Sequence, residues 1–596
     1  MFNGFFGAKQ ITEKHDRICV NRYLAKVSIL INCTNIIGNT LETFMRTLFL
    51  LNMRTRLLFT LLPAFISLNT AAQKQSQTLI LAGSTLSACT SSNAKNCINS
   101  QQIKGKQHSG FKVTDAKIKQ INLNWPTNNT NNKNAAVQSL AKMLNKSIKP
   151  LSKSDLLWLW RDINNEGLNS LSKQEYNFVI DMLEEFKADK VQVNTALNAQ
   201  NSTNNILQFI SGSLKVNNPN PSMLVITASS KDPYSTANRS TALFDSTNIN
   251  AQWLALTPAL AKAITTNSCN NLPALRQSEM GVYNREVIYP EQTKAEMALC
   301  KDGVHALTSL IKNSTGVMFN DGDVSLTRKV LFDENNNPYP WTQALQSRPV
   351  IVGEGAGSLV QSADAKSNLN TAIVTGGSSL GALRGDKATK QQQLTYTTAG
   401  GLGSFNYGLL DSQFSEQNRT LRLATLLSKT STKTNSDEQL QQGFGIDENT
   451  ALVVIKSPGS NLLTVLGSGG VVHLTTSSQG KTQGAKTLYN YSYWPAGSVI
   501  DIKNNKFSLS ERTVNQALPS IKIPPLPVQR FGGILYGSKL RSLTQAMCLS
   551  QEQSTVAQQD EFLIGFSITE KTSYHRVNAK EFGCAISNLN LALSTF

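Results

Sequence analysis

The stretch Arg348–Gln361 reads RPVIVGEGAGSLVQ, which is a short β-branched run, a glycine-rich turn and the start of a helix. Gly353, Gly355 and Gly357 have the spacing of the G-x-S-x-G turn of strand-turn-helix hydrolases, where a strained bend lifts a serine out of the sheet edge. The central residue here is Gly355, which has no side chain. Taken alone, the glycines would indicate only a tight turn, and an enzyme built on this turn would have no nucleophile.

The composition limits the classes of protein to consider. A chain of 596 residues is long enough for two or more domains and a large core. It has 57 Lys and Arg against 39 Asp and Glu, but no dense basic run with interleaved aromatic residues. We therefore expect no nucleic-acid partner, and a basic surface would suit a secreted protein near anionic envelopes.

A secretory signal is predicted near the N-terminus. Met53–Arg56 is a positively charged first region, Leu57–Leu68 is a short apolar run, and Asn69–Ala72 has the small residues of a cleavage site. The apolar run is too short to span a bilayer comfortably. We therefore expect a signal peptide over 53–72, export to the periplasm or the extracellular space, and no transmembrane span in the mature chain. Residues 1–52 would be an upstream over-extension, and the alternative is a cytoplasmic leader with an anchor helix.

Six cysteines remain after such a cleavage. An even number in an exported chain predicts up to three disulfides, and pairing of sequence neighbours is the simplest connectivity. No C-x-x-C or His-rich spacing suggests a metal site, and no cofactor is expected. The six residues are Cys89, Cys97, Cys269, Cys300, Cys548 and Cys584.

The main domain is expected over residues 73–475. Thr78–Ala82 is an apolar first strand, and residues 90–220, approximately, form a mostly helical insert. Within the insert, Ser172 and Glu175 have the spacing of a capping box at a helix start. Residues 476–596 are expected to be a less regular C-terminal extension.

From residue 221 onward, apolar strands alternate with helices. This order predicts an α/β fold with a mostly parallel sheet sandwiched by helices, and sites at the carboxyl ends of its strands. The expected elements are a strand at Met223–Thr227, a helix within 251–264, a strand near Val287, a helix at Thr293–Ile311 and a strand at Gly316–Phe319.

Four further motifs follow in order along the chain. They read GVMFNDGD at Gly316–Asp323, IVTGGSSLGAL at Ile373–Leu383, DSQFSEQNRTLR at Asp411–Arg422 and GFGIDENTAL at Gly443–Leu452. Together with the glycine-rich turn at Gly353–Gly357, they resemble the secreted members of the cyanophycinase family of serine peptidases, which are relatives of aspartyl dipeptidase. The resemblance covers Thr78 to about Leu474 with one insert. It is specific because all the motifs occur in this order, and no single motif would be sufficient. It implies a class I glutamine-amidotransferase-like α/β fold.

In that family a serine attacks the peptide carbonyl, a histidine takes its proton, and a carboxylate orients the imidazole. The resemblance places Gly355 at the serine position and Gln413 at the histidine position, so that Glu448 is the retained carboxylate. It implies oxyanion donors at the backbone N–H groups of Gly322 and Ala356. A degenerate triad of this kind predicts loss of hydrolysis.

The resemblance also implies residues that bind substrate. It gives this role to Asp411, Arg419 and Arg422, whereas Gln417 and Val324 replace polar contacts of the family. Asp321 stands where the family has the first glycine of its G-G-D-Q turn.

Other serines and histidines could supply a relocated triad. Ser358 lies in the helix after the bend, and Ser378 and Ser379 lie in a glycine-rich loop. His305 and His473 fall within a predicted helix and a late strand. We interpret all five as structural residues.

The sequence therefore predicts an exported serine peptidase homologue without hydrolysis, which retains a groove for a peptide or an aspartate/arginine polymer. The first alternative is an active serine-type peptidase that cleaves cyanophycin or β-aspartyl peptides with a non-equivalent nucleophile. The second alternative is a structural or interaction protein of the envelope, in which the insert and the extension bind the partner.

Overall fold

The computed structural model describes residues 76–99, 103, 110–146, 149–186, 191–216, 218–364, 371–430, 441–458, 460–476, 487–521, 523–524, 533–579 and 582–595. The expected signal peptide and the residues before it lie outside these ranges. Within them, no helix combines the length and the apolar character that crossing a membrane requires.

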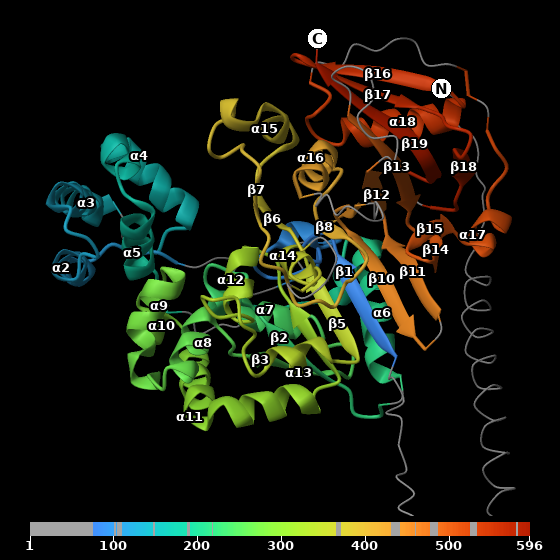
Figure 1. The fold of residues 1–596 in the computed structure, drawn as a ribbon. Coiled ribbons are helices and arrows are strands. Elements are labelled where there is room, and N and C mark those ends of the chain that lie inside the picture. Colours follow the sequence, from blue (N-terminus) through green and yellow to red (C-terminus); the bar gives the residue numbers. More distant parts are fainter. Residues whose placement is uncertain are drawn as a thin grey trace, which may run out of the picture. The chain divides into compact units, whose positions relative to one another are not determined.

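A nine-stranded sheet forms the centre of the described chain (Figure 1), with the strand order β15-β14-β11-β10-β1-β5-β4-β2-β3. Its strands are β1 (Gln77–Ala82), β2 (Ser222–Ile226), β3 (Asn250–Leu254), β4 (Gly316–Phe319), β5 (Val350–Glu354), β10 (Thr450–Ser457), β11 (Ser460–Gly467), β14 (Val499–Lys503) and β15 (Lys506–Leu509).

This sheet is mixed, whereas the sequence predicted a mostly parallel one. The neighbouring strands from β1 to β3 are parallel, and the neighbouring strands from β1 to β15 are antiparallel. The lengths of the connections explain the difference. Helices separate the parallel strands along the chain, whereas short turns join β10 to β11 and β14 to β15, and a tight hairpin joins antiparallel strands. The α/β class is as expected.

Helices cover both faces of this sheet. Along β1, Leu79 and Leu81 pack into one apolar cluster and Ile80 packs into another, because successive side chains of a strand point to opposite faces. One cluster includes side chains of α11 (Pro290–Asn313), and the other includes side chains of α6 (Asn201–Lys215). Both faces of β1 are buried, which explains its continuous apolar sequence.

One expected element is confirmed and another differs in the structure. The helix predicted within 251–264 is α8 (Pro258–Thr265), and the strand β3, which was not predicted, precedes it. The Thr257 hydroxyl accepts a hydrogen bond from Leu260 N–H (3.0 Å), and this cap sets the start of α8. β3 is an edge strand with alternating exposure, so it lacks an apolar run. The predicted strand near Val287 is wrong, because these residues form the short helix α10 (Arg285–Ile288).

A second sheet lies in the C-terminal part of the described chain. The sequence after residue 476 looks irregular, but its strands extend both sheets, since β13 pairs with β12 and β14 pairs with β11. The strands of the second sheet are β8 (Leu409–Asp411), β9 (Gln442–Ile446), β12 (Gly470–Thr476), β13 (Thr487–Pro495), β16 (Ser554–Gln559), β17 (Phe562–Ser567), β18 (Ser573–Arg576) and β19 (Cys584–Thr595).

The helical insert has a core of its own, to which Leu140, Trp160 and Phe178 belong. The capping box is confirmed, because Glu175 N–H donates to Ser172 Oγ (3.2 Å) and Ser172 N–H donates to Glu175 Oε2 (2.8 Å). The helices around this core are α2 (Asp115–Leu123), α3 (Thr130–Met143), α4 (Lys153–Asn169) and α5 (Lys173–Leu183).

The predicted pairing of neighbouring cysteines is confirmed. Disulfides join Cys89 to Cys97, Cys269 to Cys300 and Cys548 to Cys584. Each bond closes a short stretch of chain, so none of them crosses between distant parts of the sequence.

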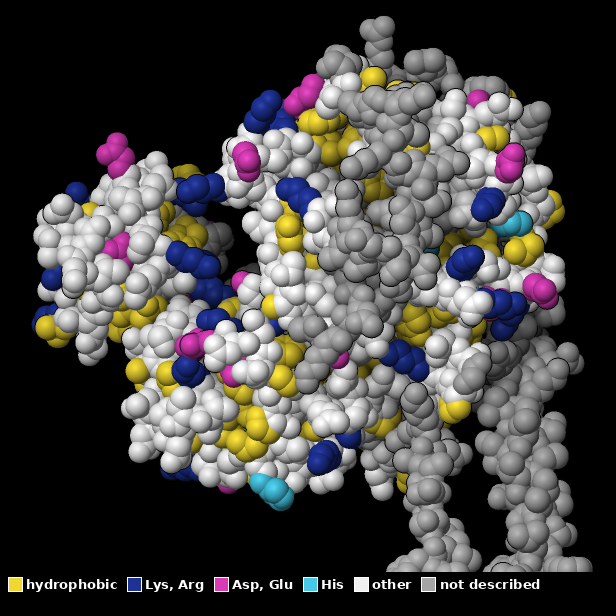
Figure 2. Space-filling model, in the orientation of Figure 1, with side chains coloured by type: hydrophobic (Ala, Val, Ile, Leu, Met, Phe, Trp, Pro, Cys, Tyr) yellow, Lys and Arg dark blue, Asp and Glu magenta, His cyan; other side chains and the backbone are white. Residues whose placement is uncertain are grey.

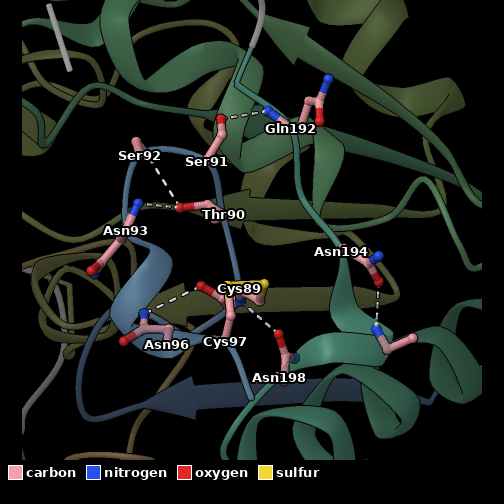
Figure 3. The surroundings of a disulfide bond; sticks show 12 residues. Cys89, Thr90, Ser91, Ser92, Asn93, Asn96, Cys97, Gln192, Asn194 and Asn198 are labelled. Carbon is pink, nitrogen blue, oxygen red and sulfur yellow. Dashed lines mark hydrogen bonds between the residues drawn. A yellow bond between two sulfur atoms is a disulfide. The ribbon is translucent and has the colours of Figure 1, made fainter. Parts of the chain in front are cut away.

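The first disulfide lies where the insert begins and ends (Figure 3). Cys89 N–H donates to Asn198 Oδ1 (2.6 Å), and Asn194 N–H donates to the Cys89 carbonyl (3.0 Å). Gln192 N–H also donates to Ser91 Oγ (3.0 Å). The chain therefore leaves the sheet and returns to it at one place.

A buried carboxylate connects the last helix to the second sheet. Asp447 follows β9, is fully buried, and accepts hydrogen bonds from Gly470 N–H (3.0 Å) and the Tyr493 hydroxyl (3.1 Å). Arg541 of α18 (Lys539–Ser550) forms an ion pair with the same carboxylate at 2.7 Å. The C-terminal helix is thus anchored through one guanidinium.

We expect Arg541→Met to destabilise the folded chain by about 3 kcal/mol or more, because it leaves Asp447 buried without its cation. Urea unfolding followed by circular dichroism measures this. The matched control is Arg384→Met, which removes a partly exposed pair with Asp560 and should cost less than about 1 kcal/mol. Equal effects of the two substitutions would contradict the anchoring role.

Candidate functional site

The turn after β5 has the backbone of a nucleophile elbow. Gly355 lies between β5 and α14 (Ala356–Leu359), with φ +46° and ψ −109°. L side chains rarely adopt this conformation, and such strain is typical of functional turns. A Cβ on Gly357 would lie 2.2 Å from the Phe319 carbonyl oxygen. The close approach of β4 therefore requires glycine at position 357.

Asp321 fills the space beside Gly355. A Cβ on Gly355 would lie 1.9 Å from Asp321 Oδ1. That oxygen accepts hydrogen bonds from Gly322 N–H (2.8 Å) and Ala356 N–H (2.9 Å), while the Thr85 hydroxyl donates to the other oxygen (3.2 Å). The two N–H groups converge on one point with the distances expected of oxyanion donors, and they hold the chain's own carboxylate.

Sequence reasoning missed the role of Asp321. The available signal was that an acidic residue stands at a glycine position of the motif that it resembles. Which way the side chain points depends on its rotamer and on the neighbouring turn, and neither can be read from the motif.

Gln413 lies just after β8 with a left-handed φ of +48°. Its N–H donates to the Gly83 carbonyl (2.8 Å), and its side-chain oxygen accepts a hydrogen bond from Arg419 Nη2 (3.3 Å). A carboxamide cannot take a proton near neutral pH. Gln413 therefore positions Arg419 and offers no general base.

Asp411 and Arg422 form a buried ion pair. Arg422 Nη2 and Nε donate to the two oxygens of Asp411 (2.5 and 3.0 Å), and Nη1 donates to the Gly377 carbonyl (2.7 Å). Every nitrogen of this guanidinium is engaged within the protein. Its geometry fits a role in holding α16 (Thr420–Thr430) against the end of β8.

Arg419 is the more accessible of the two arginines, with 20% of its side chain exposed. Its Nη1 donates to the Ser412 carbonyl (2.6 Å). Burial lowers the pKa of Arg419, and the carboxylates of Asp411, Asp321 and Glu448 act in the opposite direction. Arg419 is therefore the arginine that is better placed to meet a ligand.

Glu448 lies in the loop after β9 and is half-buried. Its backbone N–H donates to Glu416 Oε2 (2.9 Å). Among the described contacts, none joins the carboxylate of Glu448 to Gln413. A histidine-orienting contact of the kind that the resemblance implies is thus not formed between these two residues.

A polar cavity of about 560 Å³ lies at the carboxyl ends of β1, β4 and β5. Its lining includes Gly322, Ala356, Gln413, Arg419 and Arg422 of the predicted site residues, whereas Gly355, Asp411 and Glu448 are not part of that lining. A larger hollow of about 1310 Å³, near Gln77, Arg348 and Lys456, contains none of them. The residues of the polar cavity that matter below are Thr85, Asp321, Gly322, Asp323, Ala356, Gln413, Arg419 and Arg422.

The other serines are held in structural contacts. The buried Ser358 hydroxyl donates to the Ala82 carbonyl (2.8 Å). Ser378 caps α15 (Ser379–Arg384) by accepting from Gly381 N–H (3.0 Å), and the Ser379 hydroxyl donates to the Asn418 carbonyl (2.5 Å). These contacts agree with their interpretation as structural residues.

The two histidines of the main domain are not paired with a serine in the described contacts. His473 is buried between Phe444 and Trp494, and burial lowers its pKa to about 3. Its Nε2 lies 2.9 Å from Gln442 Oε1. His305 is exposed on α11.

A second carboxyl group that the sequence did not single out lies directly behind the elbow. Glu354 is fully buried, and its Oε1 accepts a hydrogen bond from Leu86 N–H (2.8 Å). Burial raises the pKa of Glu354 to about 7, and the charge of Arg239 opposes this. Glu354 is not among the residues that line the cavity.

The described residues contain no group of three or more His, Cys, Asp or Glu side chains suited to a metal ion. On the face drawn in Figure 2, the Lys and Arg side chains are spread over several elements, among neutral polar groups.

No family model matches the chain. Among solved structures, the chain is similar to a peptidase from an acI-B1 Actinobacterium, with 16% identity and a TM-score of 0.28. The similarity covers 50% of this chain and 91% of that chain. A TM-score this low does not define the fold, which is given by the topology of the two sheets.

We expect the effects of Gly355→Ser and Asp321→Gly on stability to be coupled. The serine alone should destabilise by about 1–3 kcal/mol, because its Cβ displaces the Asp321 carboxylate from a strained turn. In the Asp321→Gly background the cost should fall by about 1 kcal/mol or more. Thermal unfolding of the four proteins measures this coupling.

The matched control is Asp323→Ala, which removes a neighbouring carboxylate that lies outside the space at Gly355. This change should add independently to the cost of Gly355→Ser. If the effects of Asp321→Gly and Gly355→Ser on stability were simply additive, the carboxylate of Asp321 would not occupy the space beside Gly355.

Proposed function

We propose that this protein is an exported homologue of the serine peptidases that it resembles, without hydrolytic activity, and that its polar cavity binds a peptide or an aspartate/arginine polymer. One observation carries the proposal. The carboxylate of Asp321 is bound by the N–H groups of Gly322 and Ala356, beside a residue that has no side chain.

Peptide hydrolysis by this mechanism needs a nucleophile, a base and a site for the oxyanion. Gly355 provides no nucleophile, and Gln413 provides no base. A negative charge that developed in the cavity would meet Asp321 in place of free donors. Since removal of one oxyanion donor lowers the rate about 10²- to 10³-fold, the combined losses argue against residual peptidase activity.

The cavity keeps groups of both charges. Arg419 contributes a partly exposed guanidinium, while Asp321 and the exposed Asp323 contribute carboxylates. Pairs of guanidinium and carboxylate groups are charge-assisted and often bidentate. A ligand that carries both groups, such as an aspartate backbone with arginine side chains, would find partners of both signs.

We also propose that the nine-stranded sheet is of the class I glutamine-amidotransferase-like type. The helical insert at about 90–220 and the segment 476–596 would be additions to that domain. The three disulfides are compatible with export, since such bonds persist in oxidising compartments. Residues 53–72 would be the signal peptide.

An interaction protein of the envelope is the second candidate. The observation that favours it is Trp158 of α4, a large aromatic side chain that is 72% exposed on the insert. Exposed aromatic groups are common anchors of protein interfaces. An active peptidase with another nucleophile is less favoured, because Ser358 and Ser379 donate to buried backbone carbonyls.

We expect the triple substitution Asp321→Gly, Gly355→Ser and Gln413→His to produce hydrolysis of β-aspartyl-arginine peptides by the mature protein. It would free both N–H donors, place a serine in the turn after β5 and place a histidine just after β8. The assay follows product release over time, and the unsubstituted protein should be inactive.

The matched control carries Asp321→Gly and Gln413→His without the serine. It has the same open site but no nucleophile, so it should neither cleave nor react with a fluorophosphonate. Cleavage by the unsubstituted protein, together with fluorophosphonate labelling, would contradict the proposed loss of hydrolysis.

We expect β-aspartyl-arginine peptides to raise the melting temperature of the unsubstituted protein in proportion to the logarithm of their concentration above the Kd. Arg419→Met should weaken this effect by about tenfold in Kd, since it removes a charge-assisted contact. Lys142→Met, an exposed substitution on the insert, should leave the shift unchanged. Equal loss in both variants, or no shift in the unsubstituted protein, would favour the interaction protein.

A further inference from the structure

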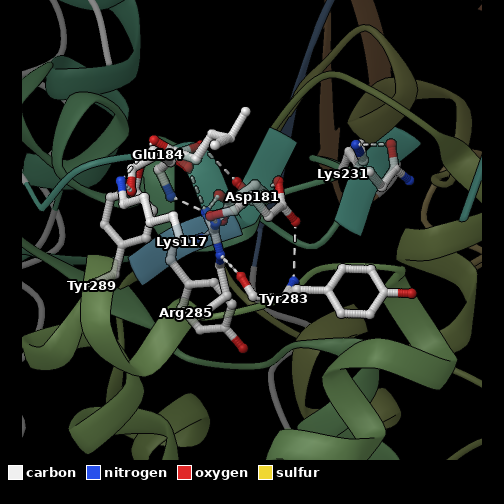
Figure 4. A network of polar contacts seen from close by, with 12 residues as sticks. Lys117, Asp181, Glu184, Lys231, Tyr283, Arg285 and Tyr289 are labelled. Carbon is white, nitrogen blue, oxygen red and sulfur yellow. Dashed lines mark hydrogen bonds and ion pairs between the residues drawn. The ribbon is translucent and has the colours of Figure 1, made fainter. Parts of the chain in front are cut away.

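The insert is docked to the main domain through one buried arginine. Arg285 is 1% exposed, and its guanidinium points between acidic residues at the end of α5 (Figure 4). Arg285 Nη1 lies 3.0 Å from Glu184 and 2.5 Å from Asp232, and Nη2 lies 3.7 Å from Asp181. Asp181 and Glu184 belong to the insert, whereas Asp232 and Arg285 belong to the main domain.

Backbone groups complete the contact. Arg285 Nε donates to the Tyr283 carbonyl (2.6 Å), and Tyr283 N–H donates to Asp181 Oδ2 (3.0 Å). The rings of Tyr283 and Phe178 meet edge to face at 5.1 Å. The insert is therefore held both by charges and by an apolar contact that does not titrate.

Lys231 is the second cation beside the acidic groups. Its ammonium donates a hydrogen bond to Asn177 Oδ1 of α5, and its positive charge favours the ionised form of Asp181. Lys153 of α4 lies within electrostatic reach of Lys231 and disfavours its charged form. Arg285 is thus shared by three carboxylates, and Asp181 is the farthest of them from its guanidinium, at 3.7 Å.

The remaining charged neighbours lie around Lys117 of α2. Lys117 donates to the carbonyl of Glu184 (3.0 Å), and Glu185 and Lys112 lie within its electrostatic reach. The Tyr289 hydroxyl donates to Glu184 Oε1 (3.2 Å). Glu184 therefore has Tyr289 and Arg285 as close partners, whereas Asp181 has the Tyr283 N–H and the longer contact with Arg285.

Burial changes the proton affinity of these two carboxyl groups. It raises the pKa of Asp181 from 3.8 to about 6, with Arg285 acting against the shift and Asp232 adding to it. It also raises the pKa of Asp232. A desolvated carboxylate that shares its cation with other carboxylates is stabilised by taking up a proton.

The same loop connects this cluster to the candidate site. Lys231 and Asp232 end the loop between β2 and α7 (Pro233–Ala242). Earlier in the loop, Ser230 Oγ accepts a hydrogen bond from Asn320 Nδ2 (2.6 Å), and the Ser229 carbonyl accepts one from Asp323 N–H (2.8 Å). Asn320 and Asp323 flank Asp321 at the cavity.

We propose that the cluster around Arg285 is a proton-dependent latch, which docks the helical insert on the loop beside the cavity more firmly in acid than at neutral pH. When the insert is docked, Asp181 is buried and favours its protonated form. When the insert is released, Asp181 is solvated and its pKa returns to the ordinary value of an aspartate. The latch does not depend on whether the cavity binds or cleaves a ligand.

The direction of the pH dependence follows from linkage. A carboxyl group whose pKa is raised in the docked state stabilises docking fully below the ordinary value of 3.8. That stabilisation is lost as the pH rises through about 6. Asp232 acts in the same direction. The contact of the Phe178 ring with the Tyr283 ring does not depend on the charge of Asp181. A rise in pH therefore weakens docking but does not abolish it.

Hydrogen exchange of the full mature chain tests the latch, with the Tyr283 amide as reporter because it donates directly to Asp181. Protection, corrected for the intrinsic exchange rate, should fall about tenfold or more between pH 5 and pH 7.5. Asp181→Asn, which cannot ionise, should remove this dependence. The control Asp162→Asn, at an exposed position of α4, should keep it.

A second variant keeps the test independent of the folding of the first. Asp232→Asn retains a good cap for α7 and removes a neighbouring negative charge, so the transition should move to lower pH. Protection that is independent of pH in the unsubstituted protein would overturn the proposal. So would a transition that survives unchanged in both Asp181→Asn and Asp232→Asn.

Discussion

The close approach of three turns at the carboxyl edge of the sheet is the constraint on which the candidate site depends. The backbone of the turn after β5 touches the end of β4 at Gly357, and the loop after β4 touches the loop after β2, where a Cβ on Gly322 would lie 2.2 Å from the Ser229 carbonyl oxygen. Because these contacts are between backbones, they hold two N–H groups in place whatever side chains the cavity carries. The backbone of this turn is therefore held independently of the side chains that line the cavity.

Gly355 and Asp321 are best understood together. A side chain at position 355 and the carboxylate of Asp321 would occupy the same space. The lack of a side chain at Gly355 makes room for the carboxylate, and the carboxylate accepts hydrogen bonds from the N–H groups of Gly322 and Ala356. Gly355 and Asp321 are thus compatible with a well-formed turn.

The sequence predicted the elements whose local pattern is strong and missed those decided by tertiary contacts. The apolar runs of β1, β2, β4 and β5 and the capping box at Ser172 could be read directly, whereas neighbour pairing was only the simplest of the possible cysteine connectivities. β3 was missed because an edge strand carries no apolar run, and α10 was missed because Arg285 is fixed by acidic groups from the insert. At the site, residue identities were available but side-chain directions were not, so the engagement of Arg422 by Asp411 came only from the structure.

The hydrogen bonds that join the Cys89–Cys97 loop to residues 192–198 have a consequence for how such a chain can arise. An inserted module whose two ends meet adds no strain to the strand order of its host, and proteins accept domain insertions at such surface sites. The host sheet can then gain, lose or exchange the module in a single recombination event. The helical insert can therefore diverge without changing the strand order of the sheet, provided that its contacts with Arg285 and Tyr283 are kept.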